Sequence, residues 1–211
     1  MRVKICGLTK LNQALEVARL GADSIGFICV KRSPRYIAAK EIAPIATALP
    51  FNTDKVGVFA ESSLAEIKEV VEIARLTSVQ LHGSESPEFC ARLRQALPQK
   101  IELIKAFRIK TAASLLEIDP YLTKVDTLLL DAYHPQMLGG TGHKIDWQDL
   151  EQFAPNLPWL LAGGLTPNNI NKALTRLQPN GIDLSSGVER SPGDKDLTKV
   201  TQLFQQRAIV R

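Results

Sequence analysis

Two residues of reactive type stand at the ends of short apolar runs, and both suit acid–base chemistry. Cys6 closes the run VKIC near the start of the chain, and Asp131 follows three leucines in TLLLDA. A thiol beside a cation can ionise to a base or nucleophile, and burial against apolar side chains favours the protonated carboxyl that a general acid needs. The alternatives are a structural buried cysteine and an aspartate that caps a loop.

Strand alternation indicates which way Cys6 points. Successive side chains of a strand face opposite sides, so Val3 and Ile5 share one face and Lys4 and Cys6 share the other. The β-branched pair should pack against helices. We therefore expect Lys4 and Cys6 to point inward, where the Lys4 ammonium would favour the thiolate and lie near the substrate. Cys29 and Cys90 are interpreted as structural.

Two glycine-containing segments suit the binding of an oxyanion. AGGLT spans residues 162–166 ahead of a helical pattern, and DLSSGVE spans residues 183–189. Glycine lets backbone N–H groups approach an oxyanion closely, and a helix N-terminus adds a favourable dipole. We therefore predict a phosphate site, whose contacts are Gly163, Gly164, Ser185, Ser186 and Gly187.

Three further positions are candidates for substrate contacts. Arg35 lies in KRSPRYI and could bind a carboxylate through two hydrogen bonds, although Lys31 and Arg32 are equally basic. His82 lies in the strand pattern of residues 78–83 on the same face as Gln80, and it either fills the interior or contacts substrate. Gly140 lies in the long segment 133–147, whose glycines would let it fold over a ligand, with a loose surface loop as the alternative.

These candidates recur at regular intervals because apolar runs alternate with segments of helical periodicity. The runs predict strands over residues 3–7, 24–30, 55–59, 78–83, 101–107, 127–132, 159–164 and 181–187. Helix starts are expected near Thr9, Ser62 or Ser63, Pro87 and Pro167. Further helices are expected near 112–119 and over about 195–208.

Eight strand–helix units predict an α/β fold, a closed single-domain (β/α)8 TIM barrel over residues 1–211. An open doubly wound sheet is the alternative, but the first strand is followed by CGLT rather than by a dinucleotide-binding glycine pattern. Active sites of such barrels lie at the C-terminal ends of the strands. The candidates above stand at these ends or in the loops that follow them.

Composition and charge narrow the class of protein. The 211 residues are 45% hydrophobic and 23% charged, as in an ordinary globular protein. No apolar run approaches the roughly 20 residues of a membrane span, and the three cysteines lack metal-ligand spacing. We expect a cytoplasmic protein without membrane association. Because the basic residues behind the net charge of +4 are scattered, an anionic small molecule fits better than nucleic acid.

Six motifs between residue 3 and about residue 196 together carry a family resemblance. In order they are KICGLT, SPRYI, VQLHG, LLLDA…GGTG…IDW, AGGLTPNNI and GIDLSSGVERSPGDKD. The set resembles the phosphoribosylanthranilate isomerase family of tryptophan biosynthesis. The resemblance implies a (β/α)8 barrel without cofactor or metal, in which N-(5-phosphoribosyl)anthranilate undergoes an Amadori rearrangement to 1-(2-carboxyphenylamino)-1-deoxyribulose 5-phosphate.

The same resemblance assigns roles to the candidate residues. It implies that Cys6 is the general base, Asp131 the general acid and Arg35 the contact for the anthranilate carboxylate. The two glycine segments correspond to the phosphate site. The sequence leaves a monomer and a homodimer equally open.

Three other functions fit the sequence less well. A sister barrel of histidine biosynthesis resembles two halves of one repeat and ends its first strand in aspartate, where this chain has Cys6. A non-enzymatic phosphate binder would tolerate loss of the acid–base pair, and both members are present. A nucleic-acid binder would need a contiguous basic face.

Overall fold

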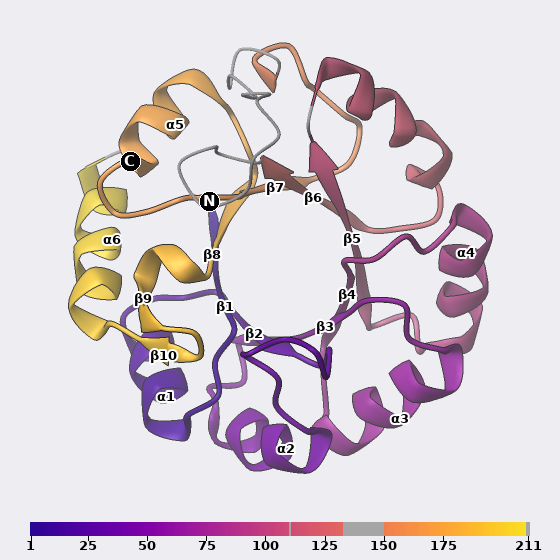
Figure 1. Ribbon diagram of the computed structural model, residues 1–211, viewed down its shortest axis with the longest axis horizontal. Helices are drawn as coiled ribbons and strands as arrows, with labels where there is room; N and C mark the ends of the chain where they lie inside the picture. Colours follow the sequence, from indigo (N-terminus) through magenta and orange to yellow (C-terminus); the bar gives the residue numbers. More distant parts are fainter. Residues whose placement is uncertain (110, 133–149, 210–211) are drawn as a thin grey trace.

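A computed structural model describes residues 1–109, 111–132 and 150–209 of the chain. Eight parallel strands close into a barrel in the order β1 to β8, which confirms the predicted fold (Figure 1). The barrel strands are β1 Arg2–Cys6, β2 Ser24–Ile28, β3 Asp54–Phe59, β4 Ser78–Leu81, β5 Glu102–Ile109, β6 Thr127–Ala132, β7 Trp159–Ala162 and β8 Gly181–Leu184.

Helices surround the barrel in Figure 1, and a short hairpin follows β8. The α-helices are α1 Leu11–Arg19, α2 Ala39–Ala48, α3 Leu64–Ala74, α4 Pro87–Ala96, α5 Ile170–Arg176 and α6 Leu197–Ile209. The 3-10 helices are η1 Ala112–Glu117, η2 Asp119–Tyr121 and η4 Ser186–Val188, and the hairpin strands are β9 Glu189–Ser191 and β10 Asp194–Lys195. No helix in the described ranges has both the length and the apolar character needed to cross a membrane.

The predicted helix starts were right in two places. Ser63 caps α3, because its hydroxyl accepts a hydrogen bond from the backbone N–H of Glu66 while the Glu66 carboxylate binds the backbone N–H of Ser63. Pro87 is the first residue of α4, where its missing N–H costs no helical hydrogen bond.

Other helix predictions were wrong for identifiable reasons. Thr9 does not cap α1, since its hydroxyl donates to the carbonyl of Gly193 at 2.8 Å. Pro167 precedes α5 by a turn rather than opening it. The segment near 112–119 forms the 3-10 helices η1 and η2 instead of an α-helix, and Pro120 lies in the first turn of η2.

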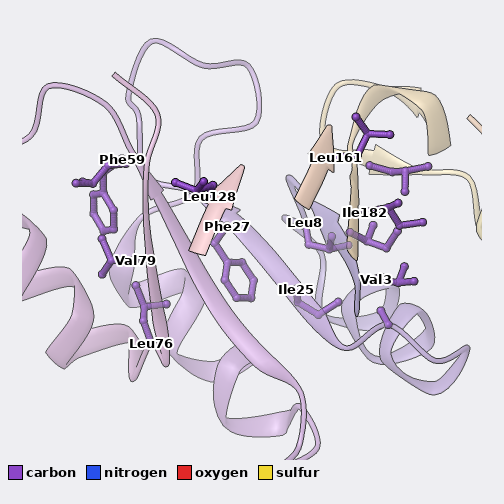
Figure 2. Close-up of a cluster of buried hydrophobic side chains, with 14 of the residues drawn as sticks. Val3, Leu8, Ile25, Phe27, Phe59, Leu76, Val79, Leu128, Leu161 and Ile182 are labelled. Carbon is purple, nitrogen blue, oxygen red and sulfur yellow. The ribbon is translucent and has the colours of Figure 1, made fainter. Parts of the chain in front are cut away.

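Two apolar layers lie on opposite sides of the barrel wall. The larger one packs between strands and helices and includes Val3 and Ile25, which Figure 2 draws with their neighbours. The smaller one fills the barrel interior and consists of Val56, Ile104, Ala106, Leu129, Leu160 and Ala162. Val3 and Ile5 belong to the outer layer, so strand alternation turns Lys4 and Cys6 inward as predicted.

A charged cluster closes the interior at the N-terminal ends of the strands. Arg2 donates to both carboxylate oxygens of Glu102, at 2.6 and 2.7 Å, and to Asp54 at 3.0 Å. The hydroxyls of Ser78 and Thr127 donate to the same Glu102 carboxylate at 3.0 and 2.7 Å. These bonds link strands distant in sequence and leave the C-terminal ends of the strands free to form a site.

Candidate active site

A cavity of about 470 Å³ opens at the C-terminal ends of the barrel strands. It gathers residues from several strands and from the loops that follow them. The predicted residues that line it are Cys6, Arg35, His82, Asp131, Gly163, Gly164, Ser185, Ser186 and Gly187. Lys4 is absent from this lining. Gly140 lies outside the described residues, as does the whole of the segment 133–147.

Cys6 lies at the end of β1 with its side chain 5% exposed. Burial raises the pKa of the Cys6 thiol above its ordinary value, the charge of Asp183 raises it too, and the ammonium groups of Lys4 and Lys195 lower it in part. Lys4 thus favours the thiolate, as the sequence suggested, but the desolvation of the buried thiol, which the sequence does not reveal, outweighs this effect.

Lys4 is fully buried below Cys6 and is bound by Asp183. Its Nζ lies 3.0 Å from Asp183 Oδ1, and the two residues are register partners on β1 and β8. The pair satisfies both charges inside the barrel, since an unpaired buried ammonium would be costly. This geometry gives no support to a substrate contact by Lys4.

Gly26 makes room for the Cys6 side chain. It is the register partner of Cys6 on β2, and a Cβ on Gly26 would lie 2.6 Å from Cys6 Sγ and 3.0 Å from Cys6 Cα. Sequence reasoning missed this residue, although a signal existed: a glycine inside a strand pattern often marks close approach of another group. Any side chain here would displace the thiol.

Asp131 is the penultimate residue of β6 and lies beside His82. The Nε2 atom of His82 is 3.4 Å from Asp131 Oδ2, and the Nδ1 atom of His82 is 2.9 Å from Gln80 Nε2. With the Gln80 amide as donor, Nδ1 accepts and Nε2 carries the proton that faces Asp131. The Asp131 side chain is 33% exposed, so the burial against apolar walls that the sequence suggested is only partial.

Arg35 follows β2 and is bound by a carboxylate that sequence reasoning did not identify. Its Nε lies 3.0 Å from each Glu189 carboxylate oxygen, and its Nη2 lies 2.6 Å from Oε2. Glu189 also accepts from Lys195 Nζ at 2.6 Å. Of the three basic residues in this loop, Arg32 and Arg35 line the cavity and Lys31 does not.

The two glycine segments meet at the cavity edge. Gly163 and Gly164 have φ of +91° and +61°, a region where residues with a Cβ are strained. A Cβ on Gly187 would overlap the carbonyl of Leu165, so the loops after β7 and β8 are in direct contact. The helix expected to begin at the first loop starts only at Ile170, so the predicted helix dipole does not adjoin these glycines.

Side chains within these loops fix their shape. The Asn169 side chain accepts from the N–H of Thr166 at 2.8 Å and donates to the carbonyl of Gly164 at 2.9 Å. The Ser185 hydroxyl donates to the carbonyl of Cys6 at 3.1 Å, which links the second loop to β1. In the parts of the chain that the structure describes, no three His, Cys, Asp or Glu side chains are grouped as a metal site.

The sequence is similar to that of known proteins over nearly the whole chain. The family model described as N-(5'phosphoribosyl)anthranilate (PRA) isomerase matches residues 3–206. The N-(5'-phosphoribosyl)anthranilate isomerase of Rippkaea orientalis is 58% identical over 98% of this chain and 95% of its own length. That of Crocosphaera subtropica is also 58% identical, over 97% of each chain.

Solved structures agree with this similarity. The phosphoribosyl anthranilate isomerase of Thermotoga maritima has a TM-score of 0.88 at 33% identity, covering 99% of this chain and 98% of that one. A phosphoribosyl anthranilate isomerase in complex with reduced 1-(o-carboxyphenylamino)-1-deoxyribulose 5-phosphate has a TM-score of 0.83 at 32% identity, covering 97% of both chains. The chain therefore belongs to the N-(5'-phosphoribosyl)anthranilate isomerase family and is an isomerase of tryptophan biosynthesis.

Proposed function

We propose that the cavity carries out the family's rearrangement with Asp131 as general acid and Cys6 as general base. The observation that supports this most is their common location: a carboxyl group from β6 and a thiol from β1 line one cavity with two glycine loops and a guanidinium. No single group in this set performs the isomerisation alone. Together they offer proton transfer and two anchoring points for anions.

The substrate, N-(5-phosphoribosyl)anthranilate, is an anion at both ends, and the cavity can hold it in one direction. Its phosphate fits the loops of Gly163–Gly164 and Ser185–Gly187, where glycine backbones allow N–H groups to approach an oxyanion. Its aromatic carboxylate fits Arg35, which enters from the loop after β2. The ribose carbons then lie between these anchors, within reach of the acid and the base.

The reaction begins at the furanose ring. Protonated Asp131 gives its proton to the ring oxygen, the bond from that oxygen to C1′ breaks, and the nitrogen lone pair forms a protonated Schiff base. The Cys6 thiolate removes the proton on C2′, which gives an enolamine. Protonation at C1′ and loss of the C2′ hydroxyl proton yield 1-(2-carboxyphenylamino)-1-deoxyribulose 5-phosphate, with no net gain or loss of atoms.

Cys6 must ionise for this step, although burial raises its pKa. Lys4 and Lys195 already favour the thiolate. The protonated Schiff base adds a further positive charge beside the thiol, a nearby opposite charge favours ionisation, and the thiol proton leaves to solvent through the open cavity. The base therefore becomes active once the ring has opened.

The test is a fluorescence assay that follows loss of phosphoribosylanthranilate. We expect Cys6→Ser and Asp131→Asn each to lower kcat by at least about a hundredfold, while circular dichroism shows a folded barrel. Cys29→Ser is the matched control, because Cys29 does not line the cavity. Near-normal turnover in either variant would remove that residue from its role. Arg35→Ala should chiefly raise KM, and unchanged kinetics would exclude Arg35 as the carboxylate contact.

A further inference from the structure

A buried ion pair beside the cavity neither gives nor takes a proton in the steps above. Glu189 opens β9 and Lys195 ends β10, and the two are register partners in the hairpin. Their side chains are 4% and 0% exposed. Two charges removed from water in this way are costly and do not by themselves stabilise a fold. Their contacts indicate what they hold in place.

Lys195 connects the hairpin to the ends of two barrel strands. Its Nζ donates to Glu189 Oε1 at 2.6 Å, to the carbonyl of Cys6 and to the carbonyl of Ser185 at 3.4 Å. An ammonium has three N–H donors, and all three are directed at these acceptors. Glu189 is thereby fixed relative to β1 and to the loop after β8.

Glu189 in turn binds one edge of the Arg35 guanidinium. Its carboxylate accepts from Nε and Nη2, which lie on the same side of the planar group. Nη1 has no hydrogen-bond partner among the described residues, and Nη2 has a second N–H. The edge formed by Nη1 and Nη2 is the one that remains for a second carboxylate.

The stem of Arg35 is restrained as well. A Cβ on Gly7 would lie 2.7 Å from Arg35 Cδ, and Gly7 has φ of +81°. The Arg35 side chain thus packs against Gly7, the residue directly after Cys6, and its guanidinium is bound by Glu189. A guanidinium fixed at both ends loses little freedom when it binds a ligand, which strengthens binding.

We propose that Glu189 is a positioning residue for substrate recognition: held by Lys195, it fixes one edge of Arg35 so that the other edge receives the substrate carboxylate. This inference rests on the proposed function of Arg35 as the carboxylate contact. Burial alone would raise the pKa of Glu189, but hydrogen bonds from Arg35 and Lys195 outweigh burial, and the pKa is lowered. Glu189 is therefore ionised at neutral pH, as the role requires.

The test measures recognition of the carboxylate itself. The probes are reduced 1-(o-carboxyphenylamino)-1-deoxyribulose 5-phosphate and the same molecule without its carboxyl group, compared as competitive inhibitors. We expect wild type to bind the carboxylated probe more tightly than the other probe. In Glu189→Gln, the ratio of the two inhibition constants should fall about tenfold, as for the loss of one charge-assisted hydrogen bond. KM should rise by a similar factor while kcat stays within about threefold of wild type.

Controls separate positioning from general damage. Glu102→Gln removes an acceptor of two Arg2 hydrogen bonds at the opposite end of the barrel, and it should keep the wild-type preference. In an Arg35→Ala background, Glu189→Gln should cause no further loss, because the positioned group is gone. If Glu189→Gln does not fold, Glu189→Asp carries the same test, since the shorter side chain keeps the charge but cannot reach both partners equally well.

The proposed function of Arg35 and the inference about Glu189 would be refuted by different results. If Arg35→Ala keeps the full preference for the carboxylated probe, the proposed function of Arg35 fails. If Arg35→Ala abolishes the preference but the folded Glu189 variants retain it, Arg35 is the contact and the inference about Glu189 is wrong.

Discussion

Gly26→Ala is a small change whose effect on the reaction can be worked out from the structure. The new methyl group would lie 2.6 Å from Cys6 Sγ, 3.0 Å from Cys6 Cα and 3.1 Å from Cys6 Cβ. Non-bonded heavy atoms pack at about 3.5–4.0 Å. The sulfur must therefore retreat by about 1 Å, and the backbone of β1 must shift by a few tenths of an ångström.

The displacement falls on the group proposed to remove the C2′ proton. A misplacement of about 1 Å can lower a rate about a hundredfold, so we expect kcat of Gly26→Ala to fall by roughly that factor. Overpacking of a well-filled interior typically costs about 1–3 kcal/mol of stability. The variant should thus remain folded at 25 °C with a lowered Tm.

Gly57→Ala separates the two effects. Gly57 lies on β3 beside Phe27 of β2, and a methyl group there would overlap the side chains of Leu76 and Phe59, away from the cavity. It should lower Tm by a similar amount and leave kcat near the wild-type value. The measurements are the fluorescence assay and thermal unfolding on all three proteins. Wild-type kcat in Gly26→Ala, or equal loss of kcat in both variants, would refute the reasoning.

Three further outcomes are expected. Because burial raises the pKa of Cys6, kcat/KM should keep rising with pH through and beyond the ordinary range of a thiol, and a plateau at neutral pH would contradict this. Gly187→Ala should raise KM and weaken inhibition by inorganic phosphate, since its methyl group would push apart the two loops that meet at Leu165; unaltered inhibition would argue against a phosphate site there. Glu102→Gln should lower the free energy of unfolding by about 2 kcal/mol at pH 7, as measured by urea denaturation. Burial alone would raise the pKa of Glu102, but hydrogen bonds from Arg2, Thr127 and Ser78 lower it. The Glu102 charge therefore contributes fully to the free energy of unfolding above the ordinary glutamate pKa, and this contribution is lost as pH falls through the folded-state pKa. The difference between the two proteins should shrink over that acidic window, and a constant difference would contradict the assignment.

The sequence predicted what depends on short-range pattern. The alternation of side chains along β1 predicted that Cys6 points inward. Val3 and Ile5 indicate the outer face of the strand, and this prediction does not require the neighbouring strands to be known. Asp131 was expected near a strand end because it follows three leucines, and it is the penultimate residue of β6 and lines the cavity. The predicted strands were too long at β4, β7 and β8, since His82 and Gly163 belong to the loops that hold the site.

Long-range pairing could not be predicted in the same way. In the run VERSPGDKD, Glu189 and Lys195 have the spacing of ordinary surface charges. Their burial depends on a hairpin that folds back on the barrel and on Arg35, which is 154 residues away in sequence. Lys4 was predicted to point inward, but its partner Asp183 becomes a neighbour only when β8 closes onto β1. The closure of the barrel therefore determines which charged side chains lie near the Cys6 thiol.

These charges have a consequence for the order of the proposed steps. Lys4 and Lys195 favour the thiolate of Cys6, while burial and Asp183 oppose it, and the opposing influences prevail before substrate reacts. A substrate carboxylate bound at Arg35 brings a further negative charge and cannot ionise the thiol. The protonated Schiff base can, because its positive charge arises beside the sulfur after the ring opens. In the proposed mechanism, Cys6 therefore accepts the C2′ proton only after Asp131 has given its own proton to the ring oxygen.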